Sequence, residues 1–406
     1  QRAIDWRHDD TATVLRKIAC AEGQPGLADT LFGLPCRLHD AHAASADTLA
    51  RAPQAAPGSV VARRGPALLR LCTDGAVWIA HVVRPNDDGD PPLKLPATRA
   101  YAAECAALPE LEVPLMRAAG DWDELHYAEH GPPGARVGWL SIDVLNGALS
   151  TRQCRRLQAA LRFARGRDTQ VLVLAGGRDF FCNGIHLHEI EAAAREPGQS
   201  AADASWANIQ AIDDVTLELL TLTDRITVAT LFGNAGAGGC FLAFAADEVW
   251  AHRGVVLNPH YRNMGNLHGS EYWTHTLPGR AGPGRADELT RRVMHGRLPM
   301  SAHEGHTLGL VDALLADDAA GLQRAALPAA LALAAAHNHA GRVAAKQQRR
   351  AADEAVKPLA THRDEELQQM HRNFYGFDPS YHVARFHFVS RKPQAWTPRH
   401  LAIHRP

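Results

Sequence analysis

The sequence predicts an α/β protein with a small β-rich domain first, a larger α/β domain second and a helical extension at its C-terminal end. Short apolar runs separated by turn residues fill residues 1–83, which is the pattern of a small β-barrel or meander. From residue 136 a strand-like run, an amphipathic segment and a second strand-like run follow one another, as in a βαβ unit. Residues beyond about 320 are rich in Ala, Leu and Gln, which favour helices. The chain has 406 residues, more than one hydrophobic core usually supports, so two domains are expected.

The β-rich domain is expected to begin with a helix over residues 10–22. Asp10 or Thr11 is the candidate N-cap, because either side chain accepts a hydrogen bond from the first helical turn. The pair Asp74–Gly75 lies between two apolar runs and predicts a hairpin turn. The strands expected around it cover residues 59–65, 67–73 and 76–84.

The larger domain is expected to alternate strands with helices. A stretch rich in Pro, Asp and Gly at residues 84–134 predicts a linker that holds one helix. We therefore expect a β-rich domain with its linker, an α/β domain and a helical extension with a tail, over residues 1–105, 106–345 and 346–406. Apolar and amphipathic runs predict the elements of the α/β domain at residues 137–145, 151–165, 169–177, 225–234 and 236–247. The aromatic, His- and Pro-containing tail at residues 387–406 is expected to wrap along the protein.

Composition narrows the class of protein. The net charge is −1 with acids and bases interspersed, so neither a nucleic-acid partner nor a polybasic membrane surface is expected. No apolar run reaches the roughly 18–20 residues that span a bilayer. The seven cysteines form no CxxC pair, and their odd number and irregular spacing predict reduced thiols in a cytoplasmic protein. The chain opens with a polar segment at Gln1, so no signal peptide is expected, and we expect the natural protein to have a further N-terminal part.

Histidines are numerous, with 23 in the chain, and invite a test for a metal site. Three closely spaced pairs occur, but they lie beside no acid or cysteine pattern that specifies zinc; they are His186 with His188, His303 with His306, and His337 with His339. We therefore expect no metal.

Two strand-to-helix junctions carry the chemical signal. Residues 176–191 and 233–249 each end an apolar strand, pass through small residues or glycine, and open a helix. Glycine lets a ligand approach the backbone, and helix starts leave N–H groups without acceptors. Two such N–H groups that converge on one point make an oxyanion hole. Each junction alone is equally compatible with a packing role for its glycines, whereas two of them about fifty residues apart favour a site.

These junctions resemble the crotonase (enoyl-CoA hydratase/isomerase) family. The segment RDFFCNGIHLHEIE is similar to the family's F-x-A-G-x-D-L-x-E pattern, and GNAGAGGCFLAFAADEVWA to its N-G-x-A-x-G-G-G pattern. The resemblance covers roughly residues 130–320 and implies a crotonase-like ββα-superhelix that binds acyl-CoA. By position it implies the backbone N–H groups of Ile185 and Gly238 as oxyanion donors. The neighbouring residues it places against the substrate are Cys182, Gly184 and Gly239.

The departures from that family pattern are as informative as the matches. Phe241 occupies the position of the first hydratase glutamate, and the proline that precedes the second one, Pro259, is followed here by His260. His186 replaces the usual aspartate of the first segment. Addition of water needs two positioned titratable groups, so ordinary hydration is not expected.

A narrower resemblance accounts for these departures. Residues 205–214, 258–273 and 374–389 resemble the HypX (HoxX) family of hydrogenase-maturation proteins, and the β-rich domain resembles the C-terminal subdomain of formyltransferases. The resemblance implies that a formyl group passes from formyltetrahydrofolate, bound by a preceding half, to coenzyme A. Formyl-CoA would then be split into CO and CoA, and the CO would serve as a ligand of the [NiFe]-hydrogenase iron. The hydrogenase maturation machinery is the partner it implies.

Three residues are candidates for the chemistry at the thioester. Removal of the formyl proton and release of the thiolate need a base and a proton donor, for which we name Glu271 and Tyr261, with His260 as a weaker candidate. The same side chains could instead cap a loop or start a helix near Ser270. Cys182 and Cys240 lack an adjacent basic partner and are expected to be buried thiols.

Other functions stay open at this point. The residues also fit another acyl-CoA enzyme of the crotonase superfamily, such as an isomerase or thioesterase. They fit equally a non-catalytic module that binds CoA or a partner protein.

Overall fold

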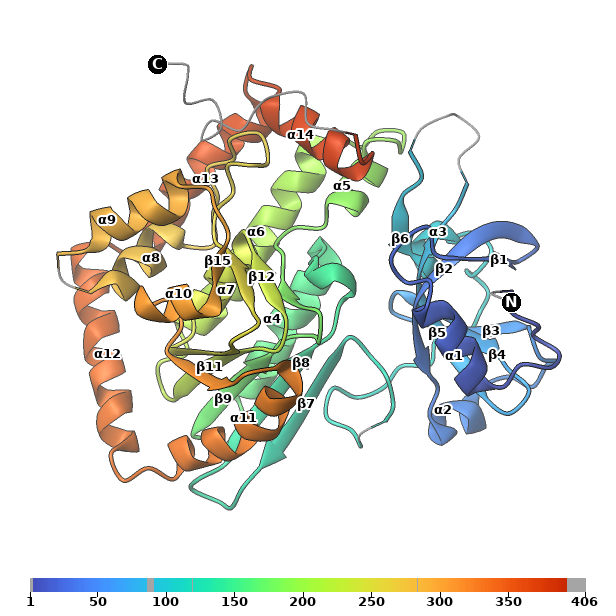
Figure 1. Ribbon diagram of the computed structural model, residues 1–406, viewed down its shortest axis with the longest axis horizontal. Helices are drawn as coiled ribbons and strands as arrows, with labels where there is room; N and C mark the ends of the chain where they lie inside the picture. Colours follow the sequence, from blue (N-terminus) through green and yellow to red (C-terminus); the bar gives the residue numbers. More distant parts are fainter. Residues whose placement is uncertain (1–2, 86–90, 119, 283, 393–406) are drawn as a thin grey trace. The chain divides into compact units, whose positions relative to one another are not determined.

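The computed structural model describes residues 3–85, 91–118, 120–282 and 284–392 (Figure 1). Backbone contacts divide the chain into two compact units, Gln1–Glu124 and Leu125–Pro406. The division lies downstream of the expected boundary between residues 105 and 106, because residues 109–121 bind the first sheet: Arg63 shares backbone hydrogen bonds with Pro109 and Leu111, and Arg64 contacts Asp121. Strand β7 (Leu125–His130), inside the expected linker, pairs with the sheet of the second unit.

The described residues of the first unit form an antiparallel sheet of six strands and three helices. The strand order is β1-β2-β5-β4-β3, and β6 also pairs with β5. The helices are α1 (Thr11–Ala19), α2 (Ala46–Arg51) and α3 (Ala97–Ala100). The strands are β1 (Leu27–Leu31), β2 (Leu34–Ala43), β3 (Val60–Arg64), β4 (Ala67–Leu71), β5 (Ala76–Val83) and β6 (Lys94–Pro96). The β-rich character is thus confirmed, and closure into a barrel stays a prediction.

Local sequence explains most of these elements. Asp10 caps α1 by accepting a hydrogen bond from the Thr13 N–H, as expected. The β4–β5 hairpin turns at Asp74–Gly75, with Leu71 opposite Ala76. Alternate residues of these strands enter two different apolar clusters on opposite faces of the sheet, because side chains alternate along a strand.

The second unit is a spiral of repeated strand–strand–helix turns. The large sheet has the order β16-β13-β11-β9-β8-β7 and is parallel except for β7, while the small sheet has the order β10-β12-β14-β15. Three successive turns each give one strand to each sheet, β9 with β10, β11 with β12 and β13 with β14, which confirms the crotonase-like superhelix. The strands are β8 (Val137–Ile142), β9 (Val171–Ala175), β10 (Phe180–Cys182), β11 (Ile226–Leu231), β12 (Asn234–Gly236), β13 (Glu248–His252), β14 (Val256–Asn258), β15 (Met300–Ser301) and β16 (Ala313–Ala316).

Helices cover these sheets and continue into a helical C-terminal region, as expected. Within the spiral they are α4 (Thr151–Arg165), α5 (Leu187–Ala193), α6 (Ala201–Leu220), α7 (Gly238–Phe244), α8 (Trp273–Ala281), α9 (Ala286–Thr290) and α10 (Ala302–Thr307), with short helical turns η1 (Leu145–Gly147) and η2 (Arg291–His295). The C-terminal ones are α11 (Ala319–Ala334), α12 (His339–Val356), α13 (Leu359–Tyr375) and α14 (Ser380–Val389). The rest of the expected tail, residues 393–406, lies outside the described residues.

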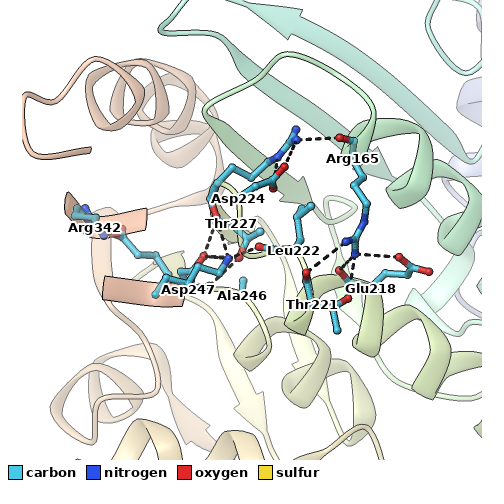
Figure 2. A network of polar contacts seen from close by, with 12 residues as sticks. Arg165, Glu218, Thr221, Leu222, Asp224, Thr227, Ala246, Asp247 and Arg342 are labelled. Atoms are coloured by element: carbon cyan, nitrogen blue, oxygen red, sulfur yellow. Dashed lines mark hydrogen bonds and ion pairs between the residues drawn. The ribbon is translucent and has the colours of Figure 1, made fainter. Parts of the chain in front are cut away.

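A polar network fastens α12 to the spiral. Lys346 donates hydrogen bonds to the carbonyl oxygens of Leu222 and Arg225 and contacts Asp247 Oδ2 at 2.6 Å. The same Asp247 carboxylate accepts from Thr227 (Figure 2). Because Lys346 is buried, each of its donors needs an acceptor, and this network supplies them.

Among the described residues, no single helix is long and apolar enough to cross a membrane. Helices α11 and α12, which are bent by 87° relative to each other, reach that length and composition only when taken together. No group of three or more His, Cys, Asp or Glu among the described residues is arranged to hold a metal ion.

Candidate active site

A cavity of about 320 Å³ lies in the second unit where the two glycine turns meet the segment before α8. It brings together most of the residues that the sequence singled out. The expected site residues that line it are Gly184, Ile185, Gly238, His260, Tyr261 and Glu271. Cys182 and Gly239 are not among the lining residues.

The two glycine turns come into direct contact. A Cβ atom on Gly184, whose φ is +81°, would lie 3.4 Å from the Gly238 nitrogen. Among the described residues, neither the Ile185 nor the Gly238 N–H donates a hydrogen bond to a protein acceptor. Ala237, just before Gly238, has φ +46° and ψ −127°, a backbone conformation that residues other than glycine rarely adopt. The backbone is therefore held so that two N–H groups remain available at one end of the cavity.

Glu271 brings its carboxyl group against this pair of donors. A Cβ atom on Gly238 would lie only 2.0 Å from Glu271 Oε1, so glycine at this position makes room for the carboxyl group. Glu271 is 1% exposed and lies two residues before α8, outside the helix, with φ +59°. The helix-start interpretation of this glutamate is therefore wrong.

Tyr261 is the hydrogen-bond partner of Glu271. The tyrosine hydroxyl donates to Glu271 Oε2 at 2.6 Å and lies 3.0 Å from the Ser270 carbonyl oxygen. Phe241 stacks on the Tyr261 ring with centroids 5.3 Å apart and planes 12° apart. The position of the first hydratase glutamate thus holds an aromatic ring that packs the tyrosine in place.

Burial sets the protonation of these groups. Removal from water, with Asp213 nearby as a second cause, raises the pKa of Glu271 well above its usual range. Burial and the Glu271 charge raise the pKa of Tyr261, so the phenol stays protonated. A carboxyl group with a raised pKa is a strong base once deprotonated, and a neutral phenol beside it can donate a proton.

The two cysteines of the turns serve packing. Burial raises the pKa of the Cys182 thiol to about 12, and it also raises the pKa of Cys240. A Cβ atom on Gly239 would lie 1.9 Å from the Cys182 carbonyl oxygen, so this glycine allows β10 and α7 to touch. Both thiols stay protonated, which supports the expectation of buried thiols without a nucleophilic role.

Several lining residues were not expected from the sequence. Asn258 and Asn263 each have a buried carboxamide oxygen that accepts no hydrogen bond from the described residues. Met370 of α13 and Phe388 of α14 also line the cavity, although they lie about a hundred residues beyond Glu271 in the chain. No motif marks Met370, and Phe388 lies in the segment 374–389, whose family resemblance assigned it no role in the site. Only the folded chain brings the C-terminal helices to the cavity.

Comparisons with known proteins agree with this geometry. The family model "Enoyl-CoA hydratase/isomerase" matches residues 143–397. Hydrogenase maturation factor HoxX of Bradyrhizobium diazoefficiens is 50% identical over 405 residues, which is 100% of this chain and 66% of that protein. The chain therefore spans just under two thirds of the length of this relative. Crystal structures of a HypX variant from Aquifex aeolicus, and of HypX in complex with tetrahydrofolic acid, each match with TM-score 0.88 and 37% identity over 100% of this chain and 68% of theirs.

The superhelix and its paired glycine turns define a domain of the enoyl-CoA hydratase/isomerase, or crotonase, class. The similarity to the two hydrogenase-maturation proteins runs through both units of the chain. The chain belongs to the HypX/HoxX family.

Proposed function

We propose that the cavity splits formyl-CoA into carbon monoxide and CoA, and that this CO is used in [NiFe]-hydrogenase maturation. The observation that carries the proposal is the carboxyl–phenol pair beside the two available N–H groups. Glu271 lies against Gly238, and Tyr261 donates to Glu271 at 2.6 Å. Phe241 replaces a hydratase glutamate, which argues against addition of water.

In the proposed reaction the Ile185 and Gly238 N–H groups polarise the thioester carbonyl. The Glu271 carboxylate removes the proton from the formyl carbon. The C–H electron pair becomes the lone pair of CO, and the C–S bond breaks with its electrons on sulfur. The proton reaches the thiolate through Glu271 and Tyr261, so the products are CO and CoA thiol, and both side chains return to their starting states.

The size and lining of the cavity support a one-carbon acyl group. A formyl group has no α-carbon, so no enolate can form and the usual crotonase chemistry does not apply. A volume of about 320 Å³ is at the low end for a ligand site, and Leu187, Ile209 and Leu267 contribute apolar walls. Such walls keep water from a thioester that is easily hydrolysed.

The formyl group is proposed to come from formyltetrahydrofolate. A HypX structure that resembles this chain contains tetrahydrofolic acid, which supports folate as the source. We propose coenzyme A as the carrier between that step and this site, and the hydrogenase maturation machinery as the recipient of CO.

The test is to give formyl-CoA to the chain and to trap CO with a reduced haem protein. Wild type is expected to release CO and free thiol in equal amounts. Glu271→Gln and Tyr261→Phe are expected to lower kcat at least about tenfold with CoA affinity retained, because each removes a proton-transfer group. CoA binding without CO from wild type would favour a binding module, and unchanged rates in both variants would remove these residues from the mechanism.

A further inference from the structure

The segment before α8 holds Glu271 in an uncommon backbone conformation. Glu271 and Tyr272 are consecutive residues other than glycine, with φ +59° and +58°. Left-handed conformations of such residues cost free energy and persist only where the surroundings impose them. The contacts that impose this conformation therefore decide where the Glu271 side chain points.

Two buried carboxyl groups capture the backbone of this segment. Asp213 Oδ1 on α6 accepts the Glu271 N–H at 2.8 Å and also the Ser270 hydroxyl. Glu366 Oε2 on α13 accepts the Tyr272 N–H at 2.9 Å. The two consecutive left-handed residues are thus each held by an acid from a different helix. Asp213 is 0% exposed and Glu366 1% exposed, so neither bond competes with water.

Glu366 is itself fixed by the start of α8. Its Oε1 atom accepts the Thr274 N–H at 2.9 Å and the Thr274 hydroxyl at 2.6 Å. His362, one turn earlier on α13, lies 2.8 Å from that hydroxyl through Nδ1. The Glu366 carboxyl group therefore spans the turn and the helix that follows it, and it cannot move without breaking several hydrogen bonds.

We propose that Asp213 and Glu366 are positioning residues that hold the Ser270–Tyr272 turn so that Glu271 points into the cavity. The proposal rests on the proposed function, in which Glu271 is the base. It gives α13, which carries Glu366, a role in the site. This helix lies beyond the expected α/β domain at residues 106–345. Neither acid lines the cavity, so each acts through the backbone rather than on the substrate.

The test compares alanine and amide variants of both acids in the full chain. Asp213→Ala and Glu366→Ala remove the acceptors. Asp213→Asn keeps a carbonyl oxygen of the same reach in place of Oδ1, whereas Glu366→Gln keeps only one of the two oxygens that accept the Tyr272 and Thr274 N–H groups. Glu218→Gln, on α6 but in a separate network with Arg162 and Arg165, is the matched control. If alanine prevents folding, Asp213→Ser and Glu366→Ser replace it, since serine is polar but too short to reach the N–H groups.

We expect the short variants to lower kcat for CO release by about tenfold or more, with KM and CoA affinity within about twofold of the control, because misplacement of a reacting group affects the chemical step. Asp213→Asn should recover at least about a third of the wild-type kcat, since its one accepting oxygen is retained. Glu366→Gln should fall between Glu366→Ala and wild type, because it loses one of two accepting oxygens. Short variants with the control's kcat would overturn the proposal. A parallel loss of CoA binding would do so as well, because it would indicate general damage to the site.

Crystal structures of the same variants separate this proposal from the proposed function. If wild type releases no CO, the proposed function fails. The positioning role is then tested by the backbone conformation of Glu271 in the variant structures alone. The short variants should lose the positive φ at Glu271, and Asp213→Asn should keep it. A Glu271 that stays in place in Asp213→Ala and Glu366→Ala would contradict the positioning role whatever the activity.

Discussion

Glu271 lies against Gly238 in the candidate site, where a Cβ atom on the glycine would lie 2.0 Å from Glu271 Oε1. The glycine supplies a backbone N–H and leaves the space in which the carboxyl group lies. A side chain at this position would push away the proposed base without changing the backbone donor. The pair therefore offers a direct test of whether the base must lie against the oxyanion donors.

Gly238→Ala is expected to lower kcat by about tenfold or more, because its Cβ would lie 2.0 Å from Glu271 Oε1. Gly341→Ala on α12 is the control, since nothing lies within 4 Å of its Cβ position. That change should leave CO release unchanged and stabilise the fold by up to about 1 kcal/mol. Equal kcat in the two variants would show that the contact is unimportant.

The buried acids also predict how stability changes with pH. Burial, with Asp213 as the next cause, raises the pKa of Glu366 to about 8, and the pKa of Glu271 is raised too. The folded protein therefore keeps protons that the unfolded chain releases near pH 4.3. The contribution of these groups to the free energy of unfolding is fully present below that pH and is lost as the pH rises toward 8.

Urea unfolding at pH 5.5 and pH 8 measures this loss. In Glu366→Gln the fall in unfolding free energy between the two pH values should be smaller than in wild type by at least about 1 kcal/mol. Glu218→Gln should keep the wild-type difference. An unchanged difference in Glu366→Gln would mean that this acid is charged in the folded state.

At the scale of elements, the sequence was most informative where a pattern is local. The Asp10 cap, the hairpin at Asp74–Gly75 and the strand–helix–strand run all follow from neighbours in the chain. Strands β1 and β2 were not identified because their polar and apolar residues alternate poorly. The site was predicted as far as the glycine turns, Tyr261 and Glu271, with help from family resemblance.

The remaining part of the site depends on long-range packing. Asp213 and Glu366 are acids within helices, where such residues are usually solvated, and no spacing rule marks them as buried. Their role is visible only when α6 and α13 lie against the turn before α8. Met370 and Phe388 likewise reach the cavity from helices that the sequence assigned to a separate extension.

Helix α14 is linked to α5, the helix that follows the glycine turn at Gly184. Arg385 Nε lies 3.0 Å from Glu191 Oε2 on α5, and their side chains are 7% and 8% exposed. Arg385→Ala should cost about 3–5 kcal/mol in unfolding free energy, because it leaves a buried carboxylate without its partner. The double change Arg385→Met with Glu191→Met should recover most of this, as measured by urea unfolding. A double variant as unstable as Arg385→Ala would indicate that packing around Arg385, rather than the ion pair, is responsible.

At the scale of the whole molecule, the proposed CoA site belongs to one of the two compact units. Every residue lining the cavity belongs to Leu125–Pro406. CoA at about 100 times its Kd should stabilise the unit that binds it by about 2.7 kcal/mol. Hydrogen exchange should therefore slow around the glycine turns and the segment before α8. Protection confined to the Gln1–Glu124 unit would place the CoA site elsewhere.

The central claim is that the site breaks the bond between the formyl carbon and sulfur without water. The most direct measurement is to supply formyl-CoA labelled with ¹³C at the formyl carbon and to follow the label. The account predicts ¹³CO bound to a haem trap, in an amount equal to the CoA thiol released, and a strong loss of both products in Glu271→Gln. Recovery of the label as ¹³C-formate would contradict it, because that product requires hydrolysis of the thioester.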